Sequence, residues 1–498
     1  MGVFLRALNI FCILLVGLYP SYLWGGRHEP SESTEATRAV ADPLDDLELT
    51  KSCEKQYQKY LRAGVSGLNA MRGRDGMLRD TVAVSKQNGQ IKVLPYKDEV
   101  APTDIALDIL VQLELLKFDE FREDAINNLK NIVSNLEKWP HDNKTGLLYR
   151  LYENGTPTVK DLSSVDNMHY AVALWSLSES IEAKELIPGL SEKAKAIYQK
   201  MDFSLFFDKE KSLIGGNLKP NEQSGYELEG YRYHLGSEAR TVYLMGFALQ
   251  NFAEISPRDF SQALSKVDIP INESGELQFW DGGVFQALLP ELLMNESKRS
   301  SSFRRNSDRL FSTVFSSPRS ITTEEGLTLK VPRAPTASIS SYGFDAGEMK
   351  LNYSGKVGIE ALKDSVNQET VDETLVVPHA FLLASLSRPC EGLAVFEQLE
   401  GLESEDVNFF EPSLGWMASA KASEGPPAAV TPMPGLVGVD KGIEVLSILR
   451  ILSANQESAS SQVISQHPVV SKRLDSALDL VNRRLIEGRE KAREQLKK

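Results

Sequence analysis

Apolar side chains recur at helical spacing along most of this chain, and this periodicity restricts the fold more than any other feature. Between residues 105 and 116 the apolar positions share one face of a helix. The same spacing returns between 125 and 136, after a short link around Phe118 that predicts an antiparallel helix pair. Further segments with helical periodicity lie at 163–182, 189–201, 236–254, 281–295, 376–387, 440–452 and 469–490.

The sequence predicts an all-α chain, because few stretches alternate between apolar and polar residues as strands do. Many helices joined by loops of Gly, Asn and Pro favour helical hairpins, either closed into a ring or stacked in a solenoid. A solenoid would show a repeat of constant period, and none is visible in the sequence. The closed ring is therefore favoured.

The N-terminus has the composition of an export signal. Arg6 precedes an apolar run over 7–19, which is shorter than the roughly 20 residues that a helix needs to span a bilayer. Residues 20–24 lack a small-x-small cleavage pattern, so an uncleaved membrane anchor stays open as an alternative. We expect a signal or anchor over 1–26, a flexible acidic leader over 27–49, the helical domain over 50–460 and a C-terminal helix over 461–498. The expected location is periplasmic or secreted, or tethered to a membrane by the first segment.

Charge and cysteine content limit the partners and the cofactors. The formal net charge of −14 disfavours nucleic acid and anionic membranes, since both attract basic surfaces, while a neutral glycan stays compatible. Cys53 and Cys390 could pair in an oxidising compartment, but cysteines so far apart in sequence are more typical of unpaired core residues. No His-rich cluster with metal-ligand spacing and no nucleotide-binding motif occurs in the sequence, so neither a metal nor a cofactor is expected.

Carboxylates and aromatic residues concentrate where several predicted helices begin. Glycoside hydrolysis needs one carboxylic acid to protonate the leaving oxygen and a second carboxylate to activate water or attack the sugar. Two segments combine these residue types: Gly236–Arg240, which reads Gly-Ser-Glu-Ala-Arg, and Leu277–Pro290, which contains Trp280-Asp-Gly. Further segments of this kind lie at 102–105, 148–152, 164–167, 342–348, 377–380 and 438–442.

This ordered set of segments resembles the glycoamylase-like family, whose members include β-1,2-glucanases and the corresponding domains of cyclic β-1,2-glucan synthases. The resemblance covers roughly residues 50 to 455. It implies an (α/α)6 toroid, a barrel of six helical hairpins. It also implies a glycoside hydrolase that acts by inversion on a glucan or related polysaccharide, with β-1,2 as the loosely implied linkage. Together with the N-terminal segment, this predicts an exported enzyme.

The resemblance assigns roles to individual residues. Glu238 is the expected general acid, against the alternative of a first-turn glutamate stabilised by the helix dipole. Asp440 is the expected second carboxylate, with a helix N-cap as an equal alternative. The residues expected to bind substrate are Asp166, Glu348, Arg240, Trp280, Tyr342, Gln286 and Tyr149. A capping role for Asp166 and core positions for the aromatic rings are the alternatives.

Two departures from the family pattern motivate a different function. Gln286 stands where synthase-type members carry Glu, and an amide is a poor proton carrier near neutral pH. Lys441 replaces a Gln beside Asp440, and contact between the two side chains would lower the pKa of that carboxylate. The alternative to hydrolysis is therefore a non-catalytic glycan-binding or cell-envelope protein that retained the toroid.

A helical scaffold for other proteins is a third hypothesis, and geometry separates it from the two carbohydrate hypotheses. We expect the protein to be a monomer. If it binds a polysaccharide, Glu238, Asp440, Asp166 and Glu348 should come together at one concave site lined by aromatic rings. A scaffold should scatter them over its surface.

Overall fold

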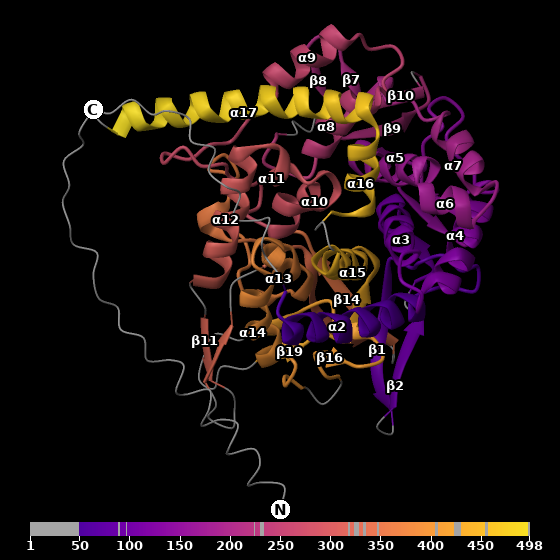
Figure 1. Cartoon of the computed structure of the whole chain (residues 1–498), viewed down its shortest axis with the longest axis vertical. Helices are drawn as coiled ribbons and strands as arrows, with labels where there is room; N and C mark the ends of the chain where they lie inside the picture. The colour runs from indigo at the N-terminus through magenta and orange to yellow at the C-terminus, as the bar shows by residue number, and fades with distance from the viewer. Residues whose placement is uncertain are drawn as a thin grey trace, which may run out of the picture. The chain divides into compact units, whose positions relative to one another are not determined.

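The computed structural model describes residues 49–496, except 88–89, 96, 224, 230–233, 317–318, 323–327, 332–334, 346–347, 404–406, 423–429 and 454–456. All of the described residues belong to the compact unit Glu48–Lys498. The predicted signal and the leader up to residue 48 lie outside the described residues. Helices dominate the unit, as predicted, and Figure 1 shows their order along the chain.

Six helices are apolar on almost every side and form the core. They are α3 (Pro102–Leu115), α5 (Ser164–Glu179), α8 (Arg240–Leu249), α10 (Val284–Met294), α13 (Pro378–Ala384) and α15 (Gly438–Leu452). α15 packs against α3, α3 against α5, and α5 against α8; α10 packs against α13, and α13 against α15. Arg240 of α8 joins the remaining pair, because its Nη2 donates to the carbonyl oxygen of Ala287 in α10 at 2.7 Å. Every residue of α3 and of α13 is buried, as expected for core helices.

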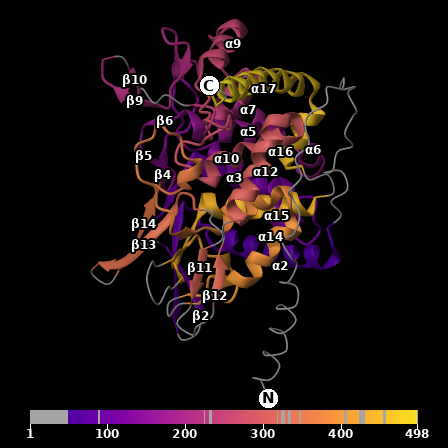
Figure 2. The same cartoon turned by 90° about the vertical axis from the view of Figure 1, so that its left-hand side faces the viewer.

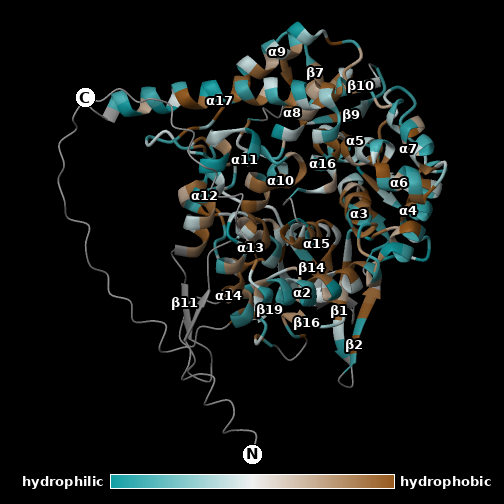
Figure 3. Ribbon diagram, viewed as in Figure 1, coloured by the Kyte–Doolittle hydropathy of each residue, from teal (hydrophilic) through white to brown (hydrophobic). Residues whose placement is uncertain are grey.

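A second set of helices is amphipathic and covers this core. They are α2 (Lys51–Ala70), α4 (Arg122–Leu136), α7 (Leu190–Tyr198), α9 (Pro257–Lys266), α12 (Ser301–Ser316) and α14 (Pro389–Leu399). α4 packs on α3, α7 on α5, α9 on α8, α12 and α14 on α13, and α2 on α15. Figure 3 shows the contrast between hydrophobic α3 and α15 and the hydrophilic outer side of α2.

Four further helices complete the unit: α6 (Ile181–Leu186), α11 (Glu296–Arg299), α16 (Ala459–Gln466) and α17 (Pro468–Leu496). The C-terminal helix expected over 461–498 is divided at His467 into α16 and α17. α17 packs against α8, α9 and α12. Among the described helices, none combines the length and the apolar composition that crossing a membrane requires.

The connections between helices contain short antiparallel sheets, which the all-α prediction did not include. The three-stranded sheets are β2 (Gln90–Pro95), β1 (Thr81–Gln87) and β20 (Gly435–Val437); β10 (Gly225–Glu229), β9 (Asn217–Asn221) and β6 (Leu162–Ser163); β15 (Leu375–Val376), β18 (Ala420–Ala422) and β19 (Val430–Pro432); and β3 (Glu99–Val100), β4 (Leu151–Glu153) and β5 (Thr156–Val159). The two-stranded sheets are β7 (Phe207–Asp208) with β8 (Leu213–Ile214), β11 (Arg319–Thr322) with β12 (Thr328–Val331), β13 (Ser338–Asp345) with β14 (Glu348–Ser354), and β16 (Phe410–Glu411) with β17 (Gly415–Trp416). Most of these strands are too short to show alternation in the sequence.

The sheets lie where the core helices begin. β3, β6, β15 and β20 end one or two residues before α3, α5, α13 and α15. Figure 2 shows β4, β5, β6, β9, β10, β13 and β14 gathered on one side of the helices. Pairing of β1 with β20 places Thr81 opposite Val437, and the Gly438 N–H donates to the carbonyl oxygen of Asp80 at 2.7 Å. Each of the strands β3, β6, β15 and β20 pairs with a strand from another segment, so the sheets tie the beginnings of the helices that follow them to neighbouring parts of the chain.

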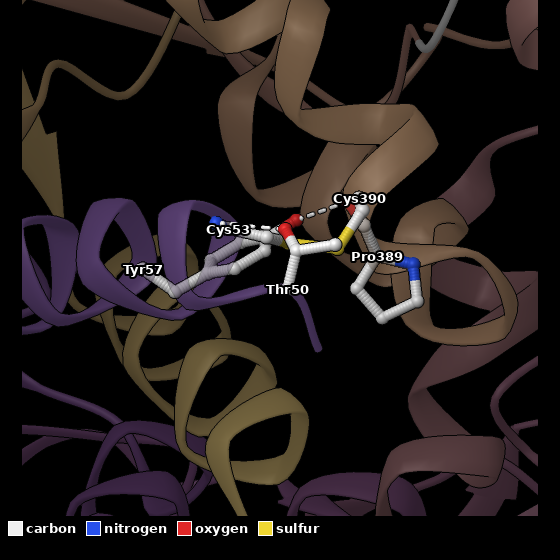
Figure 4. The surroundings of a disulfide bond; sticks show 5 residues. All are labelled: Thr50, Cys53, Tyr57, Pro389 and Cys390. Atoms are coloured by element: carbon white, nitrogen blue, oxygen red, sulfur yellow. Dashed lines mark hydrogen bonds between the residues drawn. A yellow bond between two sulfur atoms is a disulfide. The ribbon is translucent and has the colours of Figure 1, made fainter. Parts of the chain in front are cut away.

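The expectation that Cys53 and Cys390 are unpaired is wrong, because they form a disulfide with Cα atoms 5.7 Å apart. Cys53 lies in the first turn of α2 and Cys390 in the first turn of α14, and these two helices pack together. The Tyr57 hydroxyl donates to the carbonyl oxygen of Pro389 at 2.8 Å beside the bridge (Figure 4). Packing of α2 on α14 brings together residues 337 positions apart, which sequence separation alone does not reveal.

Candidate active site

Six acidic side chains come together at the N-terminal ends of the core helices. Their positions are just before β1 (Asp80), in the first turns of α3, α5 and α15 (Asp104, Asp166 and Asp440), and just before α8 and α10 (Glu238 and Asp281). The charges of Asp80, Asp166 and Asp440 act on Asp104, and those of Asp166 and Asp281 act on Glu238. We call this set the acidic cluster.

Glu238 is half-buried in a turn two residues before α8. Burial raises its pKa to about 8, and the negative charges of Asp166 and Asp281 add to the rise. A helix dipole would instead favour the ionised form, so the dipole alternative does not describe this carboxyl. Glu238 therefore carries a proton at neutral pH, which is the state that a general acid requires.

Glu238 lines a cavity of about 780 Å³ together with His234, Trp280, Gln286 and Asp364. Trp280 keeps 41% of its surface exposed, and its ring centre lies 5.5 Å from that of His234. The Oε1 atom of Gln286 is buried and has no hydrogen-bond partner within the part of the chain that the structure describes. An open indole face and an unsatisfied amide in one cavity can contact the apolar face and a hydroxyl of a sugar.

Asp281 is a site residue to which the sequence analysis gave no role, although it stands inside the Trp280-Asp-Gly segment. Burial raises its pKa to about 6, while the N–H of Gly283 donates to its Oδ1 at 2.7 Å and opposes the rise. Gly282 has φ of 73° and passes so close to Ile359 that a Cβ atom would lie 2.2 Å from its carbonyl oxygen. Glycine is thus required where the chain turns from Asp281 into α10.

Asp440 is buried, and its environment differs from the one expected. Ser338 donates to its Oδ2 at 2.6 Å, and Nδ1 of His379 lies 3.5 Å from its Oδ1. Lys441 points elsewhere: its Nζ donates to Glu444 at 2.6 Å and to the carbonyl oxygens of Leu414 and Trp416. Burial raises the pKa of Asp440 well above its usual range, and the Ser338 hydrogen bond and the charge of Lys441 oppose the rise only in part. The expected direct contact between Lys441 and Asp440 is replaced by the ion pair with Glu444.

Asp166 is half-buried in the first turn of α5, where the Ser163 side chain provides the helix cap. The Thr103 hydroxyl donates to its Oδ1 at 2.7 Å. The capping alternative for Asp166 is therefore not needed, since Ser163 accepts the hydrogen bond at the helix start. Asp104 lies nearby and keeps a buried Oδ1 atom without a hydrogen-bond partner among the described residues.

Arg240 is close to Glu238 in sequence but does not face the cavity. It is 1% exposed, and Glu296 pairs with its Nε and Nη2 at 2.8 and 2.9 Å. Its Nη1 donates to the carbonyl oxygens of Leu235 and Ser237, in the turn that carries Glu238. Together with the bond to Ala287, these contacts use every N–H group of the guanidinium, so its predicted contact with substrate is replaced by a structural role.

Two other predicted ligands do not line this cavity, and the side chain of a third lies outside the described residues. Tyr149 lies beside Tyr152, with ring centres 6.3 Å apart, in a separate group with Asp142. Tyr342 is partly buried against a small apolar cluster under the β13–β14 hairpin. Glu348 begins β14, and its side chain lies outside the described part of the structure.

Two buried histidines accompany the cluster. The pKa of His169 is lowered to about 4 by burial, against the opposing charge of Asp166, and burial lowers that of His379 to about 3. Both are therefore neutral at pH 7 and add no positive charge. Among the described residues, no three His, Cys, Asp or Glu side chains have the geometry to hold a metal ion.

Sequence reasoning gave no role to Asp80, Asp104, Asp281 or His234. Asp104 was visible inside the Pro-Thr-Asp segment, and Asp281 inside the Trp-Asp-Gly segment. Asp80 and His234 lie in no segment that suggested a site. Tertiary structure brings them in, through the pairing of β1 with β20 and the contact of His234 with Trp280.

Comparisons with known proteins bear on the fold of this chain. No family model matches the chain. Over 238 residues it is 26% identical to the cyclic β-(1,2)-glucan synthase NdvB of Rhizobium meliloti, an alignment that covers 46% of this chain and 8% of that protein. The chain thus corresponds to a small part of this curated relative.

Solved structures share the fold over nearly the whole chain. An endo-β-1,2-glucanase from Talaromyces funiculosus in complex with sophorose has a TM-score of 0.65 and 13% identity, covering 90% of this chain and 92% of that one. An endo-β-1,2-glucanase from Chitinophaga pinensis has a TM-score of 0.60 and 14% identity, covering 86% and 98%. The resemblance to glycoamylase-like proteins is thus confirmed for the fold.

Proposed function

We propose that this chain is an exported glycoside hydrolase that cleaves a β-1,2-linked glucan by inversion, with Glu238 as its general acid. The observation that carries the proposal is a glutamic acid that stays protonated near neutral pH, with a pKa of about 8, and that lines a cavity beside the open ring of Trp280. Proteins of the same fold that act on β-1,2-glucan support the substrate class.

We infer that the fold is an (α/α)6 toroid. The six core helices contact one another in cyclic order when the Arg240–Ala287 hydrogen bond is included. Each of α3, α5, α8 and α13 is followed along the chain by an amphipathic helix that packs on it, as in helical hairpins. A ring of this kind collects the N-terminal ends of its inner helices at one rim, where the acidic cluster lies.

In the reaction, Glu238 donates its proton to the glycosidic oxygen as the bond to the anomeric carbon breaks. The proton neutralises the leaving alkoxide, and water adds to the opposite face of the sugar as a carboxylate base accepts one of its protons. Trp280 holds the apolar face of a sugar ring, and the amide of Gln286 binds a hydroxyl group. After each turnover Glu238 recovers its proton from solvent through the open side of the cavity.

Two carboxylates compete for the role of base. Asp440 is the residue that the family resemblance indicates, but it is 4% exposed and burial favours its protonated form. Asp166 reaches solvent, and its charge acts directly on Glu238. The variants Asp440→Asn and Asp166→Asn distinguish the two carboxylates. Added azide or formate should restore activity to the variant that lacks the base, but not to a variant that lacks only a hydrogen-bond acceptor in the core.

The disulfide supports export. A bridge between α2 and α14 is typical of oxidising compartments. We propose that the monomeric mature protein lies in the periplasm or outside the cell, released or anchored by residues 1–26. Thiol titration of denatured protein from the native host should find no free Cys53 or Cys390 before reduction.

A non-catalytic glycan-binding protein is the second candidate. Gln286 favours it, because this neutral amide lies in the cavity where synthase-type members carry an acid. Such a protein would use the same cavity and the same aromatic ring, and would keep binding without turnover.

The test is release of reducing sugar from soluble β-1,2-glucan, with other glucans in parallel, by the wild type and by Glu238→Gln. We expect release by the wild type and a loss of about 10²- to 10⁴-fold in the variant. The matched control is Glu114→Gln, which also removes a buried acid from the core. Glu114 lies at the C-terminal end of α3, whereas the acidic cluster lies at the N-terminal ends of the core helices. Release that survives Glu238→Gln would place the acid elsewhere, and binding without any release would favour the second candidate.

A further inference from the structure

Tyr353 is an exposed aromatic residue of the β13–β14 hairpin, on the face of the hairpin that packs against the rest of the protein. It pairs with Ile339 across the β13–β14 hairpin, so the two side chains share one face, together with Leu351 two residues earlier. Ile339 and Leu351 are buried in an apolar cluster with Ala83 and Val437, from β1 and β20. Tyr353 nevertheless keeps 54% of its surface exposed. A ring that stays open on a packed face is accessible to a ligand.

This face of the hairpin adjoins the acidic cluster, because Ala83 and Val437 each lie three residues along the chain from one of its acids, Asp80 and Asp440. The hairpin also reaches the cluster through Ser338, whose hydroxyl donates to Asp440 at 2.6 Å. Surrounding protein raises the pKa of the Tyr353 hydroxyl, and the charges of four acids raise it further: Asp440, Asp80, Glu238 and Asp281. These acids belong to four different segments, so the phenol is close enough to the acidic cluster for charges on several sides of it to act on the hydroxyl.

The side chain of Tyr353 is unused within the protein. In the described part of the chain its ring does not stack on another aromatic ring and its hydroxyl has no hydrogen-bond partner. Other tyrosines differ: the hydroxyl of Tyr152 donates to Pro140, and that of Tyr226 donates to Asp142. Aromatic residues that remain exposed among charged groups are typical of sites that bind ligands with both polar and apolar faces.

We propose that Tyr353 is a glycan-binding residue, with its ring stacking on a sugar and its hydroxyl forming a hydrogen bond to a sugar hydroxyl opposite Trp280. The inference rests on the proposed function and extends it, because it makes the β13–β14 hairpin one wall of the substrate site. Sugars have apolar faces edged by hydroxyl groups, which one phenol can contact both ways. Tyr353 binds and positions substrate and takes no part in proton transfer.

The test compares Tyr353→Phe and Tyr353→Ala with the wild type, using soluble β-1,2-glucan as substrate. Loss of one hydrogen bond in Tyr353→Phe should raise KM about two- to tenfold, and loss of the ring in Tyr353→Ala should raise it tenfold or more. Neither variant should change the pH at which activity is lost on the alkaline side, because Glu238 keeps its surroundings of burial and carboxylates.

Asn352→Ala is the matched control. Asn352 precedes Tyr353 on β14 and points to the other face, where its Nδ2 donates to Ser341 at 3.0 Å. It should perturb the hairpin and leave KM unchanged. Equal KM values for wild type, Tyr353→Phe and Tyr353→Ala, at unchanged melting temperature, would overturn the inference while leaving the hydrolase intact.

Calorimetric binding of the same glucan to Glu238→Gln separates this inference from the proposed function. Tight binding that weakens when Tyr353→Ala is added supports the role of Tyr353 even if turnover proves undetectable. Binding that is indifferent to Tyr353→Ala sinks the inference. If the wild type neither binds the glucan nor releases sugar from it, the proposed function itself is wrong.

Discussion

Buried acids occur in two regions of this molecule, and the two regions treat them differently. Away from the N-terminal ends of the core helices, three buried acids are paired with cations: Glu296 with Arg240, Glu291 with Arg450 and Glu444 with Lys441, at 2.6 to 2.8 Å. In the acidic cluster, Glu238, Asp104 and Asp281 have no arginine or lysine within ion-pair distance among the described residues. Their negative charges act on one another instead.

The difference separates acids that hold the fold together from acids available for chemistry. A buried carboxylate beside a guanidinium stays ionised and fixes two elements together. A buried carboxyl among other carboxyls keeps its proton until higher pH and can donate it. The comparison therefore predicts opposite consequences when the same chemical change, carboxyl to amide, is made in each region.

The largest expected effect is on the paired acids. Glu296→Gln leaves the Arg240 charge buried without a counter-ion, and should lower the free energy of unfolding by about 3 to 5 kcal/mol. Chemical denaturation at pH 7 measures this. The double variant Arg240→Met with Glu296→Leu removes both charges and should recover much of the loss. If Glu296→Gln is as stable as the double variant, leaving the Arg240 charge without a counter-ion does not lower the free energy of unfolding.

Glu238→Gln should change the stability in the opposite direction and make the protein more stable. The pKa of Glu238 is about 8 in the folded protein, against 4.5 as its ordinary value. Between these values the unfolded chain ionises while the folded protein does not, so this carboxyl lowers stability progressively as pH rises from about 4.5 to about 8. The amide removes that penalty. The melting temperature of the variant should exceed that of the wild type at pH 8 and match it near pH 4.

A Glu238→Gln variant that melts below the wild type at pH 8 would contradict the assignment of Glu238 to the unpaired region. Glu296→Gln provides the comparison in the same experiment. Its deficit should persist at pH 8, since Arg240 remains charged throughout this range.

Sequence reasoning located the core helices because their apolar periodicity is local. It also located Glu238, Trp280 and Gln286, since each stands in a segment whose residues resemble those of a known family. It missed which acids are paired. Glu296 lies 56 positions from Arg240, and no local pattern joins them.

One error could have been avoided. Asp440 and Lys441 are adjacent on α15, and consecutive residues of a helix point in directions about 100° apart. Lys441 therefore meets Glu444, three residues later, rather than Asp440. The raised pKa of Asp440 and that of Glu238 could not have been predicted, because they arise mainly from burial that the whole fold creates and, to a lesser extent, from acids on other segments.

The smallest predicted effect tests the coupling inside the acidic cluster. The negative charge of Asp281 contributes to the raised pKa of Glu238, and Asp281 itself, with a pKa of about 6, is largely ionised at pH 7 to 8. Asp281→Asn removes this charge, so the ionised form of Glu238 becomes less unfavourable and its pKa should fall by a fraction of a unit, about 0.3 to 0.8. A general acid works only while protonated, so kcat/KM falls as pH rises through that pKa. The alkaline limb of the profile should therefore move to lower pH in Asp281→Asn, and not in Glu276→Gln, which removes an acid outside the cluster that is paired with Arg309 at 2.8 Å. An alkaline limb that stays in place while activity merely drops would mean that Asp281 acts through the turn into α10 and not through its charge, and the two regions would then differ in pairing alone.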